Sequence, residues 1–77
     1  MRRPPRYTLE DILDEFRKAP IPILTRRLLA FAASEYGPEK ANDLVVRAIR
    51  EAIHGDHTPL FAGNLYEFLS RVIERIA

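Results

Sequence analysis

Apolar and polar positions first alternate with helical spacing between residues 8 and 18. Four apolar side chains there follow an i, i+3, i+4, i+7 pattern, which places them on one stripe of an α-helix. Thr8, followed three residues later by Asp11, is a variant of the capping box that starts helices, and Pro20 and Pro22 are typical of a helix stop. We therefore predict a helix over residues 8–18 with an extended link after it. The stripe consists of Leu9, Ile12, Leu13 and Phe16.

The next two segments, residues 23–36 and 38–54, each carry an apolar arc that covers about half of a helical wheel. So broad an arc is typical of a helix with neighbours on more than one side. Gly37 is a natural end for the first of these helices, and Pro38 suits the first position of the next. The arcs consist of Leu24, Leu28, Leu29, Phe31, Ala32, Ala33 and Tyr36, and of Ala41, Leu44, Val45, Ala48, Ile49, Ala52 and Ile53, with Val46 at the edge.

The last helix has two candidate starts. Thr58-Pro59 is a cap and first-turn pair, but Gly63 is expected to interrupt the helix, and Asn64 with Glu67 then offers a second cap. A clean apolar stripe follows. Four short helices, at about 8–18, 23–36, 38–54 and 59/64–76, with short connections predict an all-α fold in which neighbouring helices pack antiparallel in a compact bundle. The last stripe consists of Leu65, Phe68, Leu69, Val72, Ile73 and Ile76.

Composition limits the classes of protein. The 77 residues suffice for one domain, which we place at 8–77, behind a flexible basic arm at 1–7. The chain is 47% hydrophobic and 30% charged, with net charge +1, so it belongs with folded chains rather than disordered ones. It has no cysteine, which excludes disulfides and thiolate metal sites. No apolar run approaches the roughly 20 residues that cross a bilayer. We expect a cytoplasmic protein with no membrane partner. Ten arginines against two lysines and no glutamine hint at a thermophilic or GC-rich source.

Both histidines lie in one short segment, His54-Gly55-Asp56-His57. Histidine and carboxylate are metal ligands, and three of them match the count of a catalytic zinc site. Ligands so close in sequence rarely converge on one ion, however, and ordinary helix-end roles fit the first three residues. Only His57 has no such role. We therefore expect no cofactor and no bound metal here, and keep His54, Asp56 and His57 as weak metal candidates.

Arg47 and His54 are separated by six residues, a spacing that resembles the Arg-x(4–6)-His pattern of HEPN-type ribonucleases, which are helical bundles. The resemblance implies two catalytic side chains two turns apart on one polar helix face. Ala48 stands where that family usually has a polar residue, and the chain is short for it. A hydrolase, whether HEPN-like or metal-dependent, is therefore the most remote hypothesis, behind a protein–protein interaction module and a nucleic-acid-associated protein. We expect no enzymatic activity.

Positive charge is concentrated in the first part of the chain. Residues 1–30 hold seven basic and four acidic side chains, whereas residues 31–77 hold five and seven. Mobile arginine arms follow phosphates in many nucleic-acid complexes. A second hypothesis is therefore a nucleic-acid-associated protein, although a net charge of +1 is a small electrostatic footprint. The candidate contacts for phosphates, or for an acidic protein partner, are Arg2, Arg3, Arg6, Arg17, Lys18, Arg26 and Arg27.

The first hypothesis is a small protein–protein interaction module. Two helices with half-turn apolar arcs and two with narrower stripes carry more apolar surface than a small monomer readily buries, and an excess would form an interface. We predict an assembly module, self-associating as a homodimer or acting as a subunit of a larger complex, that uses the edges of the second and third helices. The alternative is that the core needs all of these residues. The interface candidates are Phe31, Tyr36, Val46, Phe61 and Tyr66.

Overall fold

The computed structural model describes residues 7–61 and 63–77. In that part of the chain all the regular structure is helical, which confirms the predicted all-α class. Residues 1–6, most of the predicted basic arm, lie outside the described residues. The elements are α1 (Leu9–Lys18), α2 (Ile21–Tyr36), α3 (Pro38–His54), a 3-10 turn η1 (Thr58–Leu60) and α4 (Leu65–Ile76).

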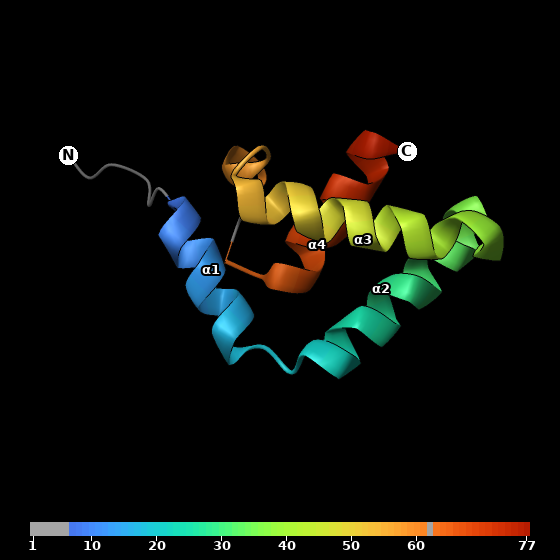
Figure 1. Ribbon diagram of the computed structural model, residues 1–77, viewed down its shortest axis with the longest axis horizontal. Coiled ribbons are helices and arrows are strands. Elements are labelled where there is room, and N and C mark those ends of the chain that lie inside the picture. The colour runs from blue at the N-terminus through green and yellow to red at the C-terminus, as the bar shows by residue number, and fades with distance from the viewer. Residues whose placement is uncertain (1–6, 62) are drawn as a thin grey trace.

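The helices form a small bundle in which α2 and α3 make a hairpin, α4 lies behind α3, and α1 lies beside the carboxyl end of α3 (Figure 1). Both α3 and α4 contact each of the other helices, so the core forms around these two. Within the described residues, no helix has the length and apolar character that a membrane crossing requires. The largest fully buried side chains are Phe68, Ile12, Leu28, Leu69, Ile73, Val45 and Val72.

The start of α1 follows the sequence prediction closely. The Thr8 hydroxyl accepts a hydrogen bond from the Asp11 backbone N–H at 3.3 Å, and the Asp11 carboxylate accepts one from the Thr8 N–H at 2.7 Å. This reciprocal capping box uses two backbone donors that a helix start would otherwise leave unpaired. The helix buries Ile12 completely, so one aliphatic side chain anchors α1 in the core.

The predicted start of the second helix was wrong by two residues. The helix begins at Ile21, and Pro22 lies in its first turn. The Pro20 carbonyl accepts from the Ile23 and Leu24 N–H groups at 3.0 and 2.9 Å. Proline is compatible with a first turn because the N–H that it lacks would have had no partner within the helix. Pro20 thus precedes the helix, and Pro22 belongs to it. The other end is as predicted, with Gly37 closing α2.

Gly55 ends α3 in a left-handed conformation, with φ of +86°. Its N–H donates to the Ala52 carbonyl and the Asp56 N–H donates to the Glu51 carbonyl, both at 3.1 Å. This pair of bonds is a Schellman motif, which satisfies carbonyls that the helix end would leave open. Gly55 also lies close to Leu9 of α1, since a Cβ here would be 3.4 Å from the Leu9 Cδ2. The turn into the 3-10 segment therefore starts at a position suited to glycine.

The last helix takes the later of its two predicted starts. Asn64 accepts from the Glu67 N–H at 3.1 Å and caps α4, while Thr58 and Pro59 belong to the separate turn η1. Phe61, in the connection between them, is buried and stacks edge-on against Phe68 at 5.2 Å between ring centres. Tyr7 stacks edge-on against the same Phe61 at 5.0 Å. The three rings join Tyr7, two residues before the start of α1, to the core.

We expect the Gly55→Ala variant to be less stable by about 1–2 kcal/mol, because an L-residue is strained at this positive φ. Asn tolerates the left-handed region better, so Gly55→Asn should lose less. Urea unfolding of both variants at neutral pH measures the difference. Equal losses for Ala and Asn would show that contact with Leu9, rather than backbone conformation, sets the requirement at this position.

Candidate functional site

The two histidines of the His54-Gly55-Asp56-His57 segment have opposite environments. His54 is exposed on the last turn of α3, and Asp56 is exposed in the turn that follows. His57 is 9% exposed, and no other polar or charged residue of the described chain is classed with the core. The chain reverses between them at Gly55, so the two imidazoles are directed differently although they are close in sequence. His57, to which the sequence pattern assigns no role, is therefore the buried histidine.

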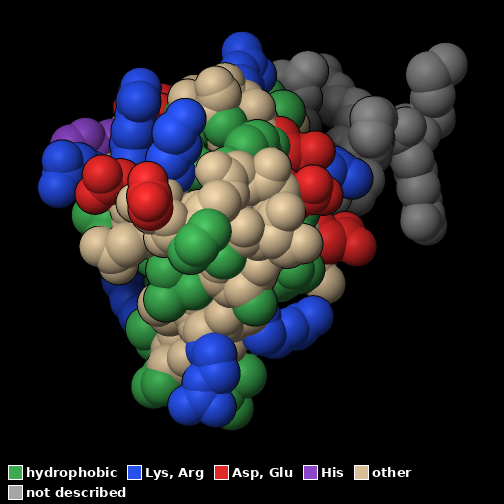
Figure 2. Space-filling view, turned by 90° about the vertical axis from the view of Figure 1, so that its right-hand side faces the viewer, with side chains coloured by type: hydrophobic (Ala, Val, Ile, Leu, Met, Phe, Trp, Pro, Cys, Tyr) green, Lys and Arg blue, Asp and Glu red, His purple; other side chains and the backbone are tan. Residues whose placement is uncertain are grey.

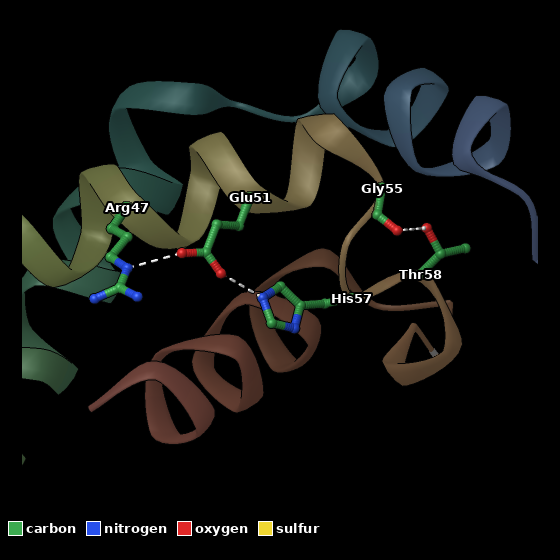
Figure 3. Close-up of polar contacts among 5 residues, drawn as sticks. All are labelled: Arg47, Glu51, Gly55, His57 and Thr58. Carbon is green, nitrogen blue, oxygen red and sulfur yellow. Dashed lines mark hydrogen bonds and ion pairs between the residues drawn. The ribbon is translucent and has the colours of Figure 1, made fainter.

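His57 is joined to α3 through a carboxylate (Figure 3). Its Nε2 lies 2.7 Å from Glu51 Oε1, and Glu51 Oε2 accepts a hydrogen bond from Arg47 Nε, also at 2.7 Å. Arg47 and Glu51 are one turn apart on α3, a pairing that their i, i+4 spacing predicts. The array runs from a surface guanidinium, 61% exposed, through a carboxylate, 23% exposed, to the buried ring.

The pKa of Glu51 is held below its ordinary value, chiefly by the hydrogen bond from His57 and then by the one from Arg47. A carboxylate only accepts hydrogen bonds, so His57 Nε2 is the donor in this short contact. The other nitrogen, Nδ1, is buried and has no hydrogen-bond partner among the described residues. One ring nitrogen is thus bonded to Glu51, and the other is buried.

The hydrogen bonding of His57 leaves one ring nitrogen without a partner among the described residues, and that nitrogen is buried. A general base must reach a substrate proton with a free nitrogen, and the only nitrogen of His57 outside its bond to Glu51 is enclosed. Among residues 7–61 and 63–77, no three histidine, aspartate or glutamate side chains are grouped so that they could hold a metal ion. Of the weak metal candidates, His57 binds Glu51, while His54 and Asp56 face solvent.

The HEPN-like pair is not joined in the structure. The Arg47 side chain bonds to Glu51, and the His54 side chain makes no hydrogen bond or ion pair with any described residue. The residue that the structure brings to Arg47 is Glu51, which the HEPN-like spacing does not include. Sequence spacing could indicate the Arg47–Glu51 pair, but the bond to His57 depends on the turn at Gly55.

The basic candidates that the structure describes gather where α1 ends and α2 begins. Lys18 Nζ lies 2.9 Å from Asp14 Oδ2 on the exposed face of α1. The Arg27 guanidinium lies over the Tyr66 ring, 4.2 Å from its centre. Arg17 and Arg26 are exposed. The remaining candidates, Arg2, Arg3 and Arg6, lie outside the described residues.

The five interface candidates differ in exposure. Val46 is 47% exposed on α3, whereas Phe31, Tyr36 and Tyr66 are partly buried against the core. Phe61 is 6% exposed, so the prediction that it offers surface to a partner was wrong, because its ring fills the space between Tyr7 and Phe68. Three exposed aliphatic side chains were not among the candidates: Ile21, Ile23 and Ile53 are 41%, 57% and 43% exposed.

Comparisons of the chain with family models, with curated proteins and with solved structures found no match.

The array on α3 predicts a pH dependence of stability. Folding lowers the pKa of Glu51, so its carboxylate stabilises the fold at neutral pH, and this contribution is lost as the pH falls through the pKa of the folded state. We expect Glu51→Gln to be less stable than the unaltered protein at pH 7, and the difference to shrink as the pH falls through the lowered pKa of folded Glu51. Urea unfolding across this range measures it.

Glu74→Gln is the matched control. Glu74 is exposed on α4 and forms no ion pair with a described residue. Its substitution should leave the stability almost unchanged at every pH. A Glu51→Gln deficit that keeps the same size from pH 7 to the lowest pH at which the protein stays folded would contradict a role for the carboxylate charge.

Proposed function

We propose that this protein is a protein–protein interaction module that self-associates through an apolar stripe on α3. The stripe consists of Val46, Ile49 and Ile53, which share one face because they are spaced i, i+3 and i+7. Val46 and Ile53 are 47% and 43% exposed, and Ile49 is partly buried against the core. The observation that carries the proposal is this row of aliphatic side chains on one helix, exposed at both of its ends.

The position of the stripe follows from how α3 is covered. Its buried side chains, Ala41, Val45, Ala48 and Ala52, form the neighbouring stripe that faces the other helices. The predicted apolar arc was wider than this buried stripe, and the apolar side chains of the arc outside the stripe are the ones that remain partly or largely exposed. Isolated exposed aliphatic residues are normal on monomers, whereas a contiguous row is typical of an interface.

A two-fold arrangement suits such a row. If two copies cross antiparallel about Ile49, Val46 of each copy lies near Ile53 of the other. Such an interface is self-complementary, as C2 dimers require. The row extends about 10 Å along the helix at 1.5 Å per residue, so it would supply the centre of an interface with polar side chains around it.

The array of Arg47, Glu51 and His57 supports a structural role for the turn that follows α3. It lies on another side of the helix from the stripe, because Glu51 and Ile53 are two residues apart and i, i+2 positions do not share a face. We therefore propose that the array fixes α3 within the domain and leaves the stripe free for a second copy.

Replacing both Val46 and Ile53 by glutamate should weaken self-association. Each change places a charge at an apolar contact and a like charge on the partner, so we expect the dissociation constant to rise at least about tenfold, which corresponds to about 1.4 kcal/mol. Light scattering and sedimentation over a concentration series measure the change. Circular dichroism should show unaltered helicity, because both side chains are exposed.

Ile23→Glu is the matched control. Ile23 is 57% exposed but lies on α2, away from the stripe. This variant should self-associate as the unaltered protein does. A monomeric unaltered protein at every concentration, or equal weakening by the control, would rule out the proposal.

A further inference from the structure

A groove of about 320 Å³ opens where the end of α1 and the start of α2 face the start of α4. Leu24 and Leu65 form part of its lining and are themselves nearly covered, at 8% and 7% exposed. Pro20 and Ile23 line the side of α2, and Tyr66 lines the side of α4. The groove therefore offers an apolar lining that is open to solvent.

Ile23 is the most exposed of the large hydrophobic side chains in the described chain, at 57%. It points away from the side of α2 that carries Leu24, Leu28 and Ala32 into the core, because it precedes Leu24 by one residue, about 100° around the helix. Its side chain is thus not needed for the core. When a partner covers such an exposed aliphatic side chain, apolar surface is removed from water, and the complex is stabilised.

The charge around the groove is mainly positive. Lys18 and Arg27 line it, with Glu15 as the one acidic lining residue. Arg17 and Arg26 are exposed on the neighbouring turns. Figure 2 shows basic and hydrophobic side chains together at the lower tip of the molecule, the end at which α1 stops and α2 starts in Figure 1. A ligand with carboxylates would be attracted to this basic corner, which is formed by Arg17, Lys18, Arg26 and Arg27.

Arg27 is held in place before any occupant binds. Its guanidinium lies 4.2 Å from the centre of the Tyr66 ring, a cation–π contact that restricts a long side chain. A restricted arginine loses less conformational entropy when it binds a carboxylate, and its planar fork can bind both oxygens.

We propose that this groove binds a short acidic segment of another protein, which inserts one apolar side chain against Ile23, Leu24 and Leu65 and places a carboxylate on Arg27. The groove lies on α1, α2 and α4, whereas the self-association stripe lies on α3. The inference is therefore independent of the proposed dimer, and the two can fail separately.

A protein segment fits better than a nucleic acid. The exposed lining of the groove is more apolar than polar, and a charged phosphate backbone would not cover it favourably. Along α1 towards its amino-terminal end, away from the groove, the charge becomes negative at Glu10, Asp11 and Asp14. A strand that continued past the basic corner would be repelled there, whereas a short peptide contacts only the corner and the groove.

The test uses a fluorescein-labelled peptide with a single leucine flanked on each side by two glutamates. Two matched probes replace the glutamates by glutamines or the leucine by serine. Fluorescence anisotropy gives the affinities, and amide shifts in nitrogen-15 NMR spectra locate the site. We expect each matched probe to bind at least about tenfold more weakly than the acidic leucine peptide, and binding to weaken with salt. The largest shifts should fall on residues 18–27 and 63–66.

Protein variants complete the experiment. Ile23→Ser and Arg27→Gln should each weaken binding of the acidic leucine peptide, while Arg71→Gln, a matched loss of charge at an exposed position of α4, should not. Circular dichroism verifies the fold of each variant. If a groove variant unfolds, the comparison of the three peptides on the unaltered protein still decides the question. Light scattering of the same samples reports self-association separately.

Three results would overturn the proposal: equal affinity for the glutamate and glutamine peptides, no binding of any probe, or shifts that lie outside the groove. A parallel titration with a single-stranded oligonucleotide tests whether the partner is a nucleic acid. Tighter binding of the oligonucleotide than of the acidic peptide at the same residues would make the corner a nucleic-acid surface instead.

Discussion

The 2.7 Å contact between His57 Nε2 and Glu51 Oε1 ties the connection after α3 back onto that helix. A domain of this size has few buried side chains. The connection between α3 and α4 places Phe61 in the core, and Leu65, at the start of α4, follows it there. Gly55 provides the backbone conformation for the reversal, and the bond to Glu51 fixes the direction in which the chain leaves it. The position of α4, which contacts every other helix, depends on this reversal.

The helices could be predicted largely because their ends are encoded locally. The capping box at Thr8, the glycine at position 55 and the cap at Asn64 each act within a few residues. The start of α2 was misplaced because two prolines so close together indicate a break, whereas the first turn accepts proline at its second position. Which of two possible starts α4 uses was also left open by the sequence, since it depends on how Phe61 packs.

The candidate site could be predicted only in part, because it depends on contacts between elements. The pair of Arg47 and Glu51 is visible in the spacing, but the third member, His57, reaches Glu51 through a turn whose path no pattern of polar and apolar residues specifies. The exposure of individual side chains was harder still to predict than the contacts of the site. Phe61 is buried but lies in a connection, where helical spacing gives no information. Val46 and Ile53 are exposed because the width of the covered face of α3 is set by the partner helices.

The single residue between α2 and α3 has a consequence for how the domain assembles. Gly37 alone separates Tyr36 from Pro38, so closing this hairpin costs little chain entropy. The most extensive packing between helices is also found there. Contacts between elements adjacent in sequence are formed early in folding, since long loops need not close first. We expect the α2–α3 hairpin to organise in the folding transition state, with α1, held by Ile12, adding its contacts later.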